Sequence, residues 1–336
     1  MTFTSAGKMT EPRSTGQVPL EPLDATTPYQ LNPANDPRRS PNFGMIDGLA
    51  EAMPREHNLE MFRRMALTRF FDLRAQKAQL DGNVECYIYL AVGQEATPAA
   101  VSMSMRGSWV LGQHRCHSIY LSFDGSPTAL ADELLGLPTG CCGGMGGSPP
   151  INDFEKRIIG HNGLVGDQVP VAAGIALTSN GETVVCFFGD GAAEEDYVLA
   201  AMGFAASRKL PLLFVCEDND LSVLTPTIER RTWSLKNVAE GFGMPAVDIT
   251  DDPWLVDHWT REMGAQLPAL INVRTCRELW HVGAGCDGDA EWNRYELTKN
   301  KLAALGMAAD VEKVETEISN FVDDLWRERL QRPSKI

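Results

Sequence analysis

Two apolar segments of this 336-residue chain are each followed by residues that can bind a divalent cation. Segment 184–188 leads into Gly189, Asp190, Gly191 and Ala192, and segment 212–216 leads into Glu217, Asp218 and Asn219. Asp190 and Asn219 are 29 residues apart, which is the length of one strand–helix–strand unit. Because parallel strands present their carboxyl ends at one edge of a sheet, we expect the two side chains to meet there.

The position of Asp190 favours a bound cation over a bare phosphate site. A helix is expected to begin directly after it, and a helix N-terminus attracts anions through its free N–H groups. An acid at the same place would repel an anion unless a cation lay between them. Mg²⁺ takes a near-octahedral shell of oxygens, often including phosphate. We therefore predict a Mg²⁺ site made by Asp190, Asn219, the main-chain carbonyl of Leu221 and two diphosphate oxygens.

Strands and helices alternate along the part of the chain that must position these residues. Three apolar runs lack the alternation of a half-exposed strand, at 183–188, 212–216 and 269–273, and helical patterns cover 193–208 and 253–267. Such runs are typical of strands covered on both faces. We predict an α/β fold with a parallel sheet flanked by helices. Further elements are expected as helices at 58–80, 95–105 and 129–137, a short strand at 109–111, a glycine-rich loop at 140–147 and an amphipathic C-terminal helix at 309–330.

The proline content divides the chain into two parts. Residues 1–57 are rich in proline and polar residues and predict an extended N-terminal arm. The arm is either disordered or wraps a partner subunit, and the sequence favours neither. Residues 58–336 are expected to form one α/β domain with a C-terminal helical extension.

Charge and hydropathy exclude several classes of function. The net charge of −15 argues against binding to nucleic acids or anionic membranes, since both are polyanions. We find no apolar run of about 18 residues, the minimum for a membrane-spanning helix, and no apolar signal core at the start. The cysteine spacing matches no zinc motif and fits a reducing compartment, so we expect a cytoplasmic protein.

The chain from about residue 58 onward resembles the alpha subunit of the first component of 2-oxo acid dehydrogenase complexes, of the pyruvate, branched-chain 2-oxo acid and acetoin dehydrogenase type. Four segments carry the resemblance in the family's order: GQHRCH at 112–117, IIGHNGLVGDQVPVAAGIAL at 158–177, the GDGAA…EDN segment from 189 to 219, and VRTCRELWH at 273–281. It implies a thiamine-diphosphate-binding fold, with thiamine diphosphate and Mg²⁺ as cofactors. Asp218 stands where the family pattern usually has asparagine.

The resemblance also implies roles for individual residues. Asp190, Asn219 and the carbonyl of Leu221 would bind Mg²⁺, Arg115 and Gln113 would reach phosphate oxygens, and Gly163 and Val165 would touch the aminopyrimidine ring. His117 and His281 would be the catalytic histidines beside the thiazolium carbon. His161 is expected to be structural. The implied cofactor-binding set is Gln113, His114, Arg115, Gly163, Val165, Gly189, Asp190, Gly191, Ala192, Asn219, Leu221 and His281.

A second chain is implied as well. In the resembled family a glutamate of the beta subunit completes the site, so we expect an α₂β₂ heterotetramer that decarboxylates a 2-oxo acid and passes the acyl group to a lipoyl acceptor. Two alternatives stay open. One is an acyl or aldehyde transferase that uses a carrier or a small molecule as acceptor, and the other is a non-catalytic relative that only binds a partner chain. A dinucleotide-binding site is disfavoured. Its G-x-G-x-x-G motif would need a third glycine after Gly189 and Gly191, and Glu194 stands at that position.

Overall fold

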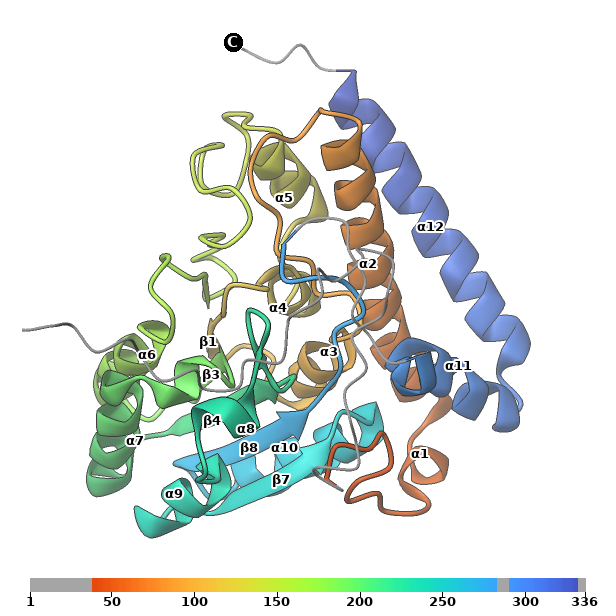
Figure 1. Cartoon of the computed structure of the whole chain (residues 1–336). Coiled ribbons are helices and arrows are strands. Elements are labelled where there is room, and N and C mark those ends of the chain that lie inside the picture. Colours follow the sequence, from red (N-terminus) through yellow and green to blue (C-terminus); the bar gives the residue numbers. More distant parts are fainter. Residues whose placement is uncertain (1–37, 283–289, 332–336) are drawn as a thin grey trace, which may run out of the picture.

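A six-stranded parallel sheet forms the centre of the chain, in the order β2-β1-β3-β4-β8-β7 (Figure 1). The computed structural model describes residues 38–282 and 290–331. The strands are β1 (Trp109–Leu111), β2 (Ile158–Ile159), β3 (Val184–Gly189), β4 (Leu212–Asp218), β7 (Ala246–Thr250) and β8 (Ala269–Arg274). The predicted fold class, a parallel sheet flanked by helices, is therefore confirmed.

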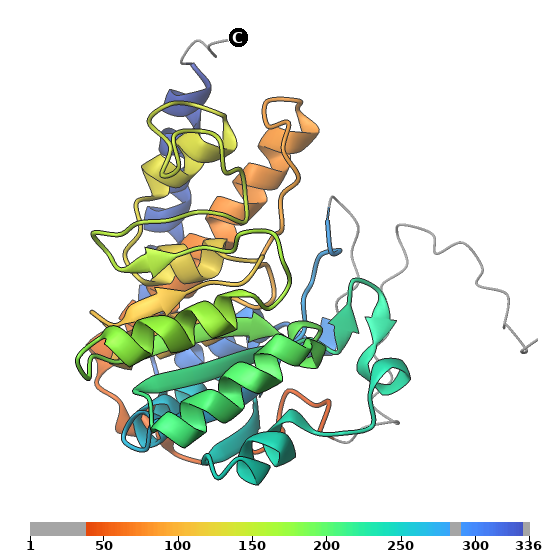
Figure 2. The same cartoon turned by 90° about the vertical axis from the view of Figure 1, so that its left-hand side faces the viewer.

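Helices cover both faces of the sheet, and Figure 2 shows α6 and α7 side by side over one of them. Successive side chains of a strand point to opposite faces. Val185 and Phe187 of β3 accordingly join the core beneath α2, α3 and α10, whereas Cys186 and Phe188 join the core beneath α6, α7 and α9. The helices are α1 (Leu49–Ala52), α2 (Arg55–Leu80), α3 (Ala96–Ser104), α4 (His117–Ser122), α5 (Pro127–Leu134), α6 (Gln168–Thr178), α7 (Asp196–Arg208), α9 (Leu235–Gly241), α10 (Pro253–Gly264), α11 (Arg294–Ala304) and α12 (Ala308–Leu330).

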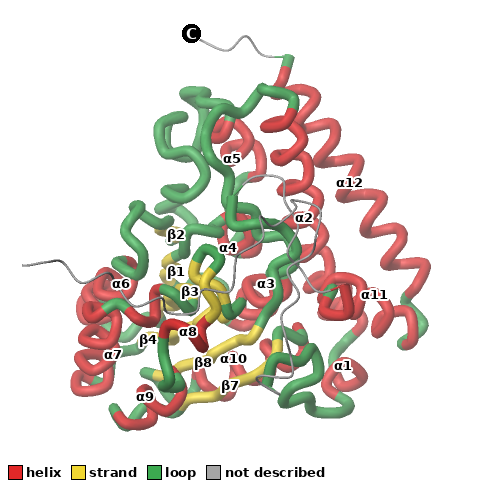
Figure 3. Tube along the Cα trace, viewed as in Figure 1, coloured by secondary structure: helices red, strands yellow, loops and turns green. Residues whose placement is uncertain are grey.

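The predicted C-terminal helix is present as α12, which lies along α2. Its Trp326 is fully buried and packs on Phe71 of α2, with ring centroids 5.5 Å apart. Between α5 and α6 the chain is mostly loop, as Figure 3 shows, and this stretch contains the predicted glycine-rich segment. In residues 38–282 and 290–331, no helix has the length and apolar character needed to cross a membrane.

The segment after β3 differs from the single helix that we predicted from residue 193. A 3-10 turn covers Ala192–Glu194, Glu195 is extended with ψ of 134°, and α7 begins only at Asp196. Glu194 forms ion pairs with Arg230 and Arg231. Asp196 therefore lies in the first turn of α7, whereas ion pairs with Arg230 and Arg231 hold Glu194 in the turn before it.

The described part of the N-terminal arm packs on the domain of its own chain. Thr250, at the end of β7, donates its main-chain N–H to the carbonyl of Phe43 at 3.2 Å. Arg294 of α11 donates to the carbonyl of Pro41 at 2.5 Å. α2 begins at Arg55, before the predicted domain boundary at 57. Residues 38–54 thus belong to the folded unit, and residues 1–37 lie outside the described part.

Candidate functional site

A cavity of about 180 Å³ lies at the carboxyl ends of β3 and β4. Gly189 of β3 pairs with Glu217 of β4, so Asp190 and Asn219 follow two strand ends that are direct neighbours. Every residue of the predicted cofactor-binding set lines this cavity: Gln113, His114, Arg115, Gly163, Val165, Gly189, Asp190, Gly191, Ala192, Asn219, Leu221 and His281. The structure thus gathers these residues at one place, and their role as ligands stays a prediction.

The structure does not place His117 on the cavity wall. Its ring is fully buried, with Nδ1 2.6 Å from Oδ1 of Asp72 in α2 and Nε2 3.0 Å from Oγ of Ser148. The resemblance implied that His117 and His281 both lie beside the thiazolium carbon; in the structure both ring nitrogens of His117 instead have partners in the core. Oγ of Ser148 also accepts the main-chain N–H of Tyr89 at 3.1 Å, so His117 supports a segment that does line the cavity.

His114 is the histidine that lies beside His281, with ring centroids 5.3 Å apart. Tyr89 packs against both rings, 5.4 Å from His114 and 5.3 Å from His281. Burial and then the positive charges of Arg115 and Arg277 lower the pKa of His281 to about 4. Burial, together with Arg115, also lowers the pKa of His114. Both imidazoles are therefore neutral at pH 7 and can donate or accept a hydrogen bond.

Several residues of the cavity were missed by the sequence reasoning. Tyr89, His161, Gln168, Glu217 and Arg277 line it. His161, which we expected to be structural, lies 6.2 Å from His114 between ring centroids, and its Nδ1 accepts the main-chain N–H of Gly163. Arg277 is four residues before His281, so its position in the same quoted segment was the signal that could have identified it.

Asp190 is buried, and its carboxylate lies beside the guanidinium of an arginine. Oδ2 accepts from the Thr227 hydroxyl at 3.3 Å and forms an ion pair with Arg230, at the end of α8 (Thr227–Arg230). Burial and then the nearby charge of Asp218 raise the pKa of Asp190, while Arg230 opposes that shift. Among the described residues, every hydrogen bond to this carboxylate uses Oδ2, so Oδ1 is the oxygen that can face a cation.

The side chain of Asn219 is oriented from two sides. Its Nδ2 donates to Oε1 of Gln94 at 3.0 Å, and its Oδ1 accepts the main-chain N–H of Leu221 at 3.1 Å. Leu221 begins β5 (Leu221–Ser222), which pairs with β6 (Thr225–Pro226) in a hairpin beside the cavity. Because a carbonyl oxygen has two lone pairs, Oδ1 of Asn219 retains one for a metal.

Buried polar atoms without partners also point to a polar ligand. Four residues that line the cavity carry such atoms within the described chain: Oε1 of Gln113, Nε2 of His114, Oε1 of Gln168 and Oε1 of Glu217. Buried polar groups in proteins are normally hydrogen-bonded. A Cβ atom on Gly191 would lie 2.8 Å from Oγ and 3.1 Å from Cβ of Ser222, so Ser222 packs closely on the main chain at this point of the wall. The unpaired polar atoms make the cavity suited to a polar ligand.

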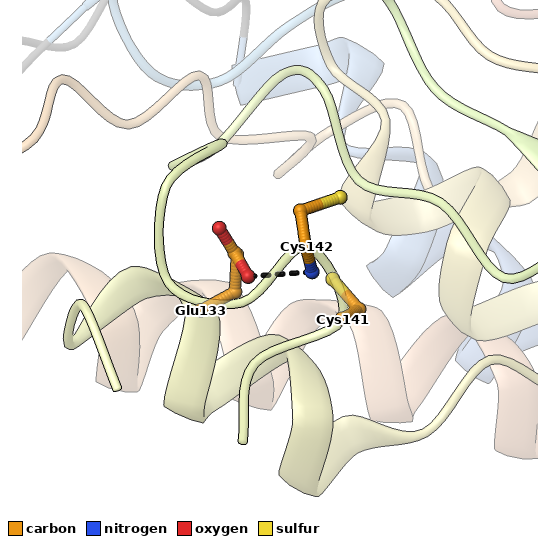
Figure 4. Close-up of side chains that lie close together, drawn as sticks. All are labelled: Glu133, Cys141 and Cys142. Atoms are coloured by element: carbon orange, nitrogen blue, oxygen red, sulfur yellow. Dashed lines mark hydrogen bonds between the residues drawn. The ribbon is translucent and has the colours of Figure 1, made fainter. Parts of the chain in front are cut away.

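A second cluster of possible metal ligands lies in the glycine-rich loop (Figure 4). One oxygen or sulfur atom each of Glu133, Cys141 and Cys142 lies within 4.8 Å of the others. The Glu133 carboxylate, however, accepts four main-chain N–H groups, from Cys142, Gly144, Gly146 and Gly147. Burial, with Cys142 and Glu133 nearby, raises the pKa of the Cys141 thiol to about 12, and the thiolate is the form that binds metals. We conclude that Glu133 anchors the loop through these main-chain contacts.

The loop that carries Arg277 and His281 is anchored by an ion network at Glu278. Arg69 of α2 bonds to both oxygens of Glu278, at 2.9 and 2.7 Å, and to Oε1 of Glu95 at 2.9 Å. A single guanidinium thus serves two carboxylates. Glu278 is partly exposed and Glu95 is fully buried, and burial raises the pKa of Glu95 to about 7 from 4.5.

We expect Glu95→Gln to weaken the pH dependence of stability. The folded chain keeps the Glu95 proton up to about pH 7, whereas the unfolded chain loses it near pH 4.5, so unfolding releases a proton between these values. Stability then falls as the pH rises through this window, and glutamine removes that contribution. Melting temperatures between about pH 5 and about pH 8 test this, with the exposed Glu85→Gln as control. Equal pH slopes in wild type and Glu95→Gln would contradict it.

Comparisons with known proteins identify the family of this chain. The family model "Dehydrogenase E1 component" matches residues 62–277. Pyruvate dehydrogenase E1 component subunit alpha-3 of Arabidopsis thaliana is 28% identical over 88% of this chain and 78% of its own length. The alpha subunit of acetoin:2,6-dichlorophenolindophenol oxidoreductase of Cupriavidus necator is 29% identical over 74% of this chain and 77% of its own length.

Solved structures share the fold at lower similarity. Transketolase of Campylobacter jejuni superposes with a TM-score of 0.54 at 16% identity, over 84% of this chain and 50% of the transketolase chain. This chain therefore spans half of that enzyme, and the likeness concerns the fold alone. The family match covers most of the α/β domain, including both strand ends and every cavity residue except His281. The chain belongs to the dehydrogenase E1 component family.

Proposed function

We propose that this chain is the alpha-type subunit of a thiamine-diphosphate- and Mg²⁺-dependent 2-oxo acid dehydrogenase. The observation that carries the proposal is the meeting of Asp190 and Asn219 at neighbouring strand ends, in one cavity with Arg115 and His281. Membership of the dehydrogenase E1 component family supports the same activity.

The donor set of the cavity fits a metal-bound diphosphate. Oδ1 of Asp190 and Oδ1 of Asn219 are hard oxygen ligands of the kind that Mg²⁺ prefers. Leu221 lines the same cavity and would offer its carbonyl. Arg115 and Arg277 place two guanidinium groups on the wall, where they would attract phosphate or carboxylate oxygens.

Bound thiamine diphosphate would supply a nucleophilic carbon and an electron sink for decarboxylation. The residues of this chain would bind and orient the reactants. His281, which is neutral at pH 7, can donate a hydrogen bond to a substrate oxygen and can take up a proton. Arg115 donates to the carbonyl of Leu90 at 2.6 Å and contacts His281, so it links the phosphate side of the cavity to the histidine.

Apolar side chains around the cavity support a partner subunit. Leu164 and Ile228 are 67% and 68% exposed, and Val165 and Val223 of the cavity wall are exposed as well. Val171, Leu177 and Phe204 add exposed apolar groups on the outer side of α6 and α7. Exposed apolar groups that gather in this way are typical of interfaces. We propose that a beta-type chain covers the mouth of the cavity and completes an α₂β₂ enzyme in the cytoplasm.

Reconstitution with the beta-type chain from the same source tests the proposal. We expect the pair, but not the alpha chain alone, to bind thiamine diphosphate with Mg²⁺ in calorimetry and to release CO₂ from a 2-oxo acid. Reduction and acylation of a lipoyl domain would identify the dehydrogenase. Acyl transfer only to a carrier protein or small molecule would identify the transferase alternative. A pair that assembles but binds no cofactor would overturn the proposal.

A further inference from the structure

Asp218 is a buried acid directly before the predicted metal ligand Asn219. Its Oδ2 accepts from Nδ2 of Asn272 at 3.3 Å and lies 3.7 Å from Nη1 of Arg274, both on the neighbouring strand β8. Its carbonyl accepts the main-chain N–H of Thr275 at 3.0 Å. These contacts attach the end of β4 to β8. None of these contacts with β8 uses Oδ1 of Asp218 or the turn that follows Asn219.

The remaining partner of Asp218 comes from the N-terminal arm. Arg39 is only 5% exposed. Its Nη1 donates to the carbonyl of Asp218 at 2.8 Å, and its Nη2 forms an ion pair with Oδ1 of the same residue. Nη2 also lies 3.2 Å from Oδ1 of Asp220. One guanidinium therefore holds the residue before Asn219 and the residue after it.

The turn at Asn219 is held by contacts on both of its sides. Asp220 has a φ of 68°, in the left-handed region, which aspartate adopts more readily than most residues other than glycine. Its main-chain N–H donates to Oδ1 of Asp218 at 3.1 Å, so the Arg39 pair and this turn share the same oxygen. The carbonyl of Asp220 accepts the N–H of Thr227, which leads into the α8 segment that bonds to Asp190.

We propose that Arg39 is a positioning residue for the cofactor site, because it fixes the turn that presents Asn219 to the cavity. The inference rests on the proposed function of that cavity. Asp218 stands where the resembled family usually has asparagine. A buried carboxylate needs a positive charge beside it. Arg39 of the arm supplies such a charge, which explains why an acid is tolerated at this position. The arm is then part of the site and not only a surface extension.

A set of variants in the reconstituted complex tests this role. Arg39→Ala is expected to weaken thiamine diphosphate–Mg²⁺ binding in calorimetry by about tenfold, which corresponds to about 1.4 kcal/mol. Arg39→Lys keeps the charge but loses the two-pronged contact and should be intermediate. The double variant Arg39→Ala with Asp218→Asn removes the buried charge that has lost its nearest guanidinium, and it should bind more tightly than Arg39→Ala alone. Arg38→Ala is the matched control, because Arg38 is 44% exposed and pairs with Asp248 instead.

The readouts separate positioning from simple stabilisation. A positioning role predicts a raised KM for the cofactor with a smaller change in kcat at saturating cofactor, and recovery of affinity in the double variant. Wild-type affinity in Arg39→Ala, or a lowered melting temperature with unchanged affinity, would overturn the inference. If Arg39→Ala does not assemble with the beta-type chain, cofactor affinity and melting temperature are compared between Arg39→Lys and the double variant instead. Wild-type affinity in both would overturn the inference. Absence of binding in the wild type would instead refute the proposed function.

Discussion

Asp190→Ala is expected to weaken thiamine diphosphate–Mg²⁺ binding to the reconstituted complex by more than about 100-fold, since metal stabilisation of bound charge is worth several kcal/mol. Asp190 is the charged member of the predicted ligand pair and lies at the end of β3. Without it, Mg²⁺ would keep only neutral ligands from this chain. Asp190→Asn keeps an oxygen at the same place but not the charge, so it should lie between wild type and alanine.

The Asp190 variants need a fold control, because Arg230 loses a partner when the carboxylate is removed. Arg230 retains its ion pair with Glu194. We therefore expect only a modest drop in melting temperature alongside the large loss of affinity. Asp196→Asn, at the exposed start of α7, should match wild type in both measurements. Unchanged cofactor affinity in Asp190→Ala would remove the basis for the metal site.

Glu133→Ala is expected to lower the free energy of unfolding by about 3–5 kcal/mol. The four main-chain N–H groups of the glycine-rich loop lose their charged acceptor, and each unsatisfied group costs about 1–3 kcal/mol. Water can reach part of this half-buried loop and hydrogen-bond to some of the N–H groups. The expected loss of unfolding free energy is therefore smaller than the summed cost of four unsatisfied groups. For a chain of 336 residues each kcal/mol corresponds to a fall of about 1–2 °C in melting temperature, because the entropy of unfolding grows with chain length.

Two comparisons make the Glu133 prediction specific. Glu133→Gln keeps the shape, but its amide NH₂ faces N–H donors, so most of the loss should remain. Glu85→Ala removes an exposed acid and should leave the melting temperature unchanged. A metal site would behave differently: Zn²⁺ would raise the melting temperature of wild type, and Cys142→Ser would abolish that increase. Such a result would contradict the anchoring role of Glu133.

Much of the central fold could be predicted because its signals are local. The apolar runs of β3, β4 and β8 and the periodic pattern of α2 and α12 need only neighbouring residues to be recognised. The elements that were missed have weak local signals. The helix α6 is apolar all round, so it lacks a helical period. Strand β7 lies at the edge of the sheet, and three of its five residues are only partly buried. Partners elsewhere in the chain stabilise both.

The sequence by itself determined that Asp190 and Asn219 meet at the cavity, because the strand ends and their spacing place both at one edge of the sheet. Only the tertiary structure decided which side chains in and around the cavity form hydrogen bonds, ion pairs or ring contacts with one another. His117 is bonded to Asp72 in the core, His114 lies beside His281, and Arg39 pairs with Asp218 across 179 residues of sequence. The physical reason is that electrostatic and hydrogen-bond energies depend on distances between side chains. Those distances are set by the packing of segments that are far apart in the chain. The spacing of residues along the sequence therefore does not predict them.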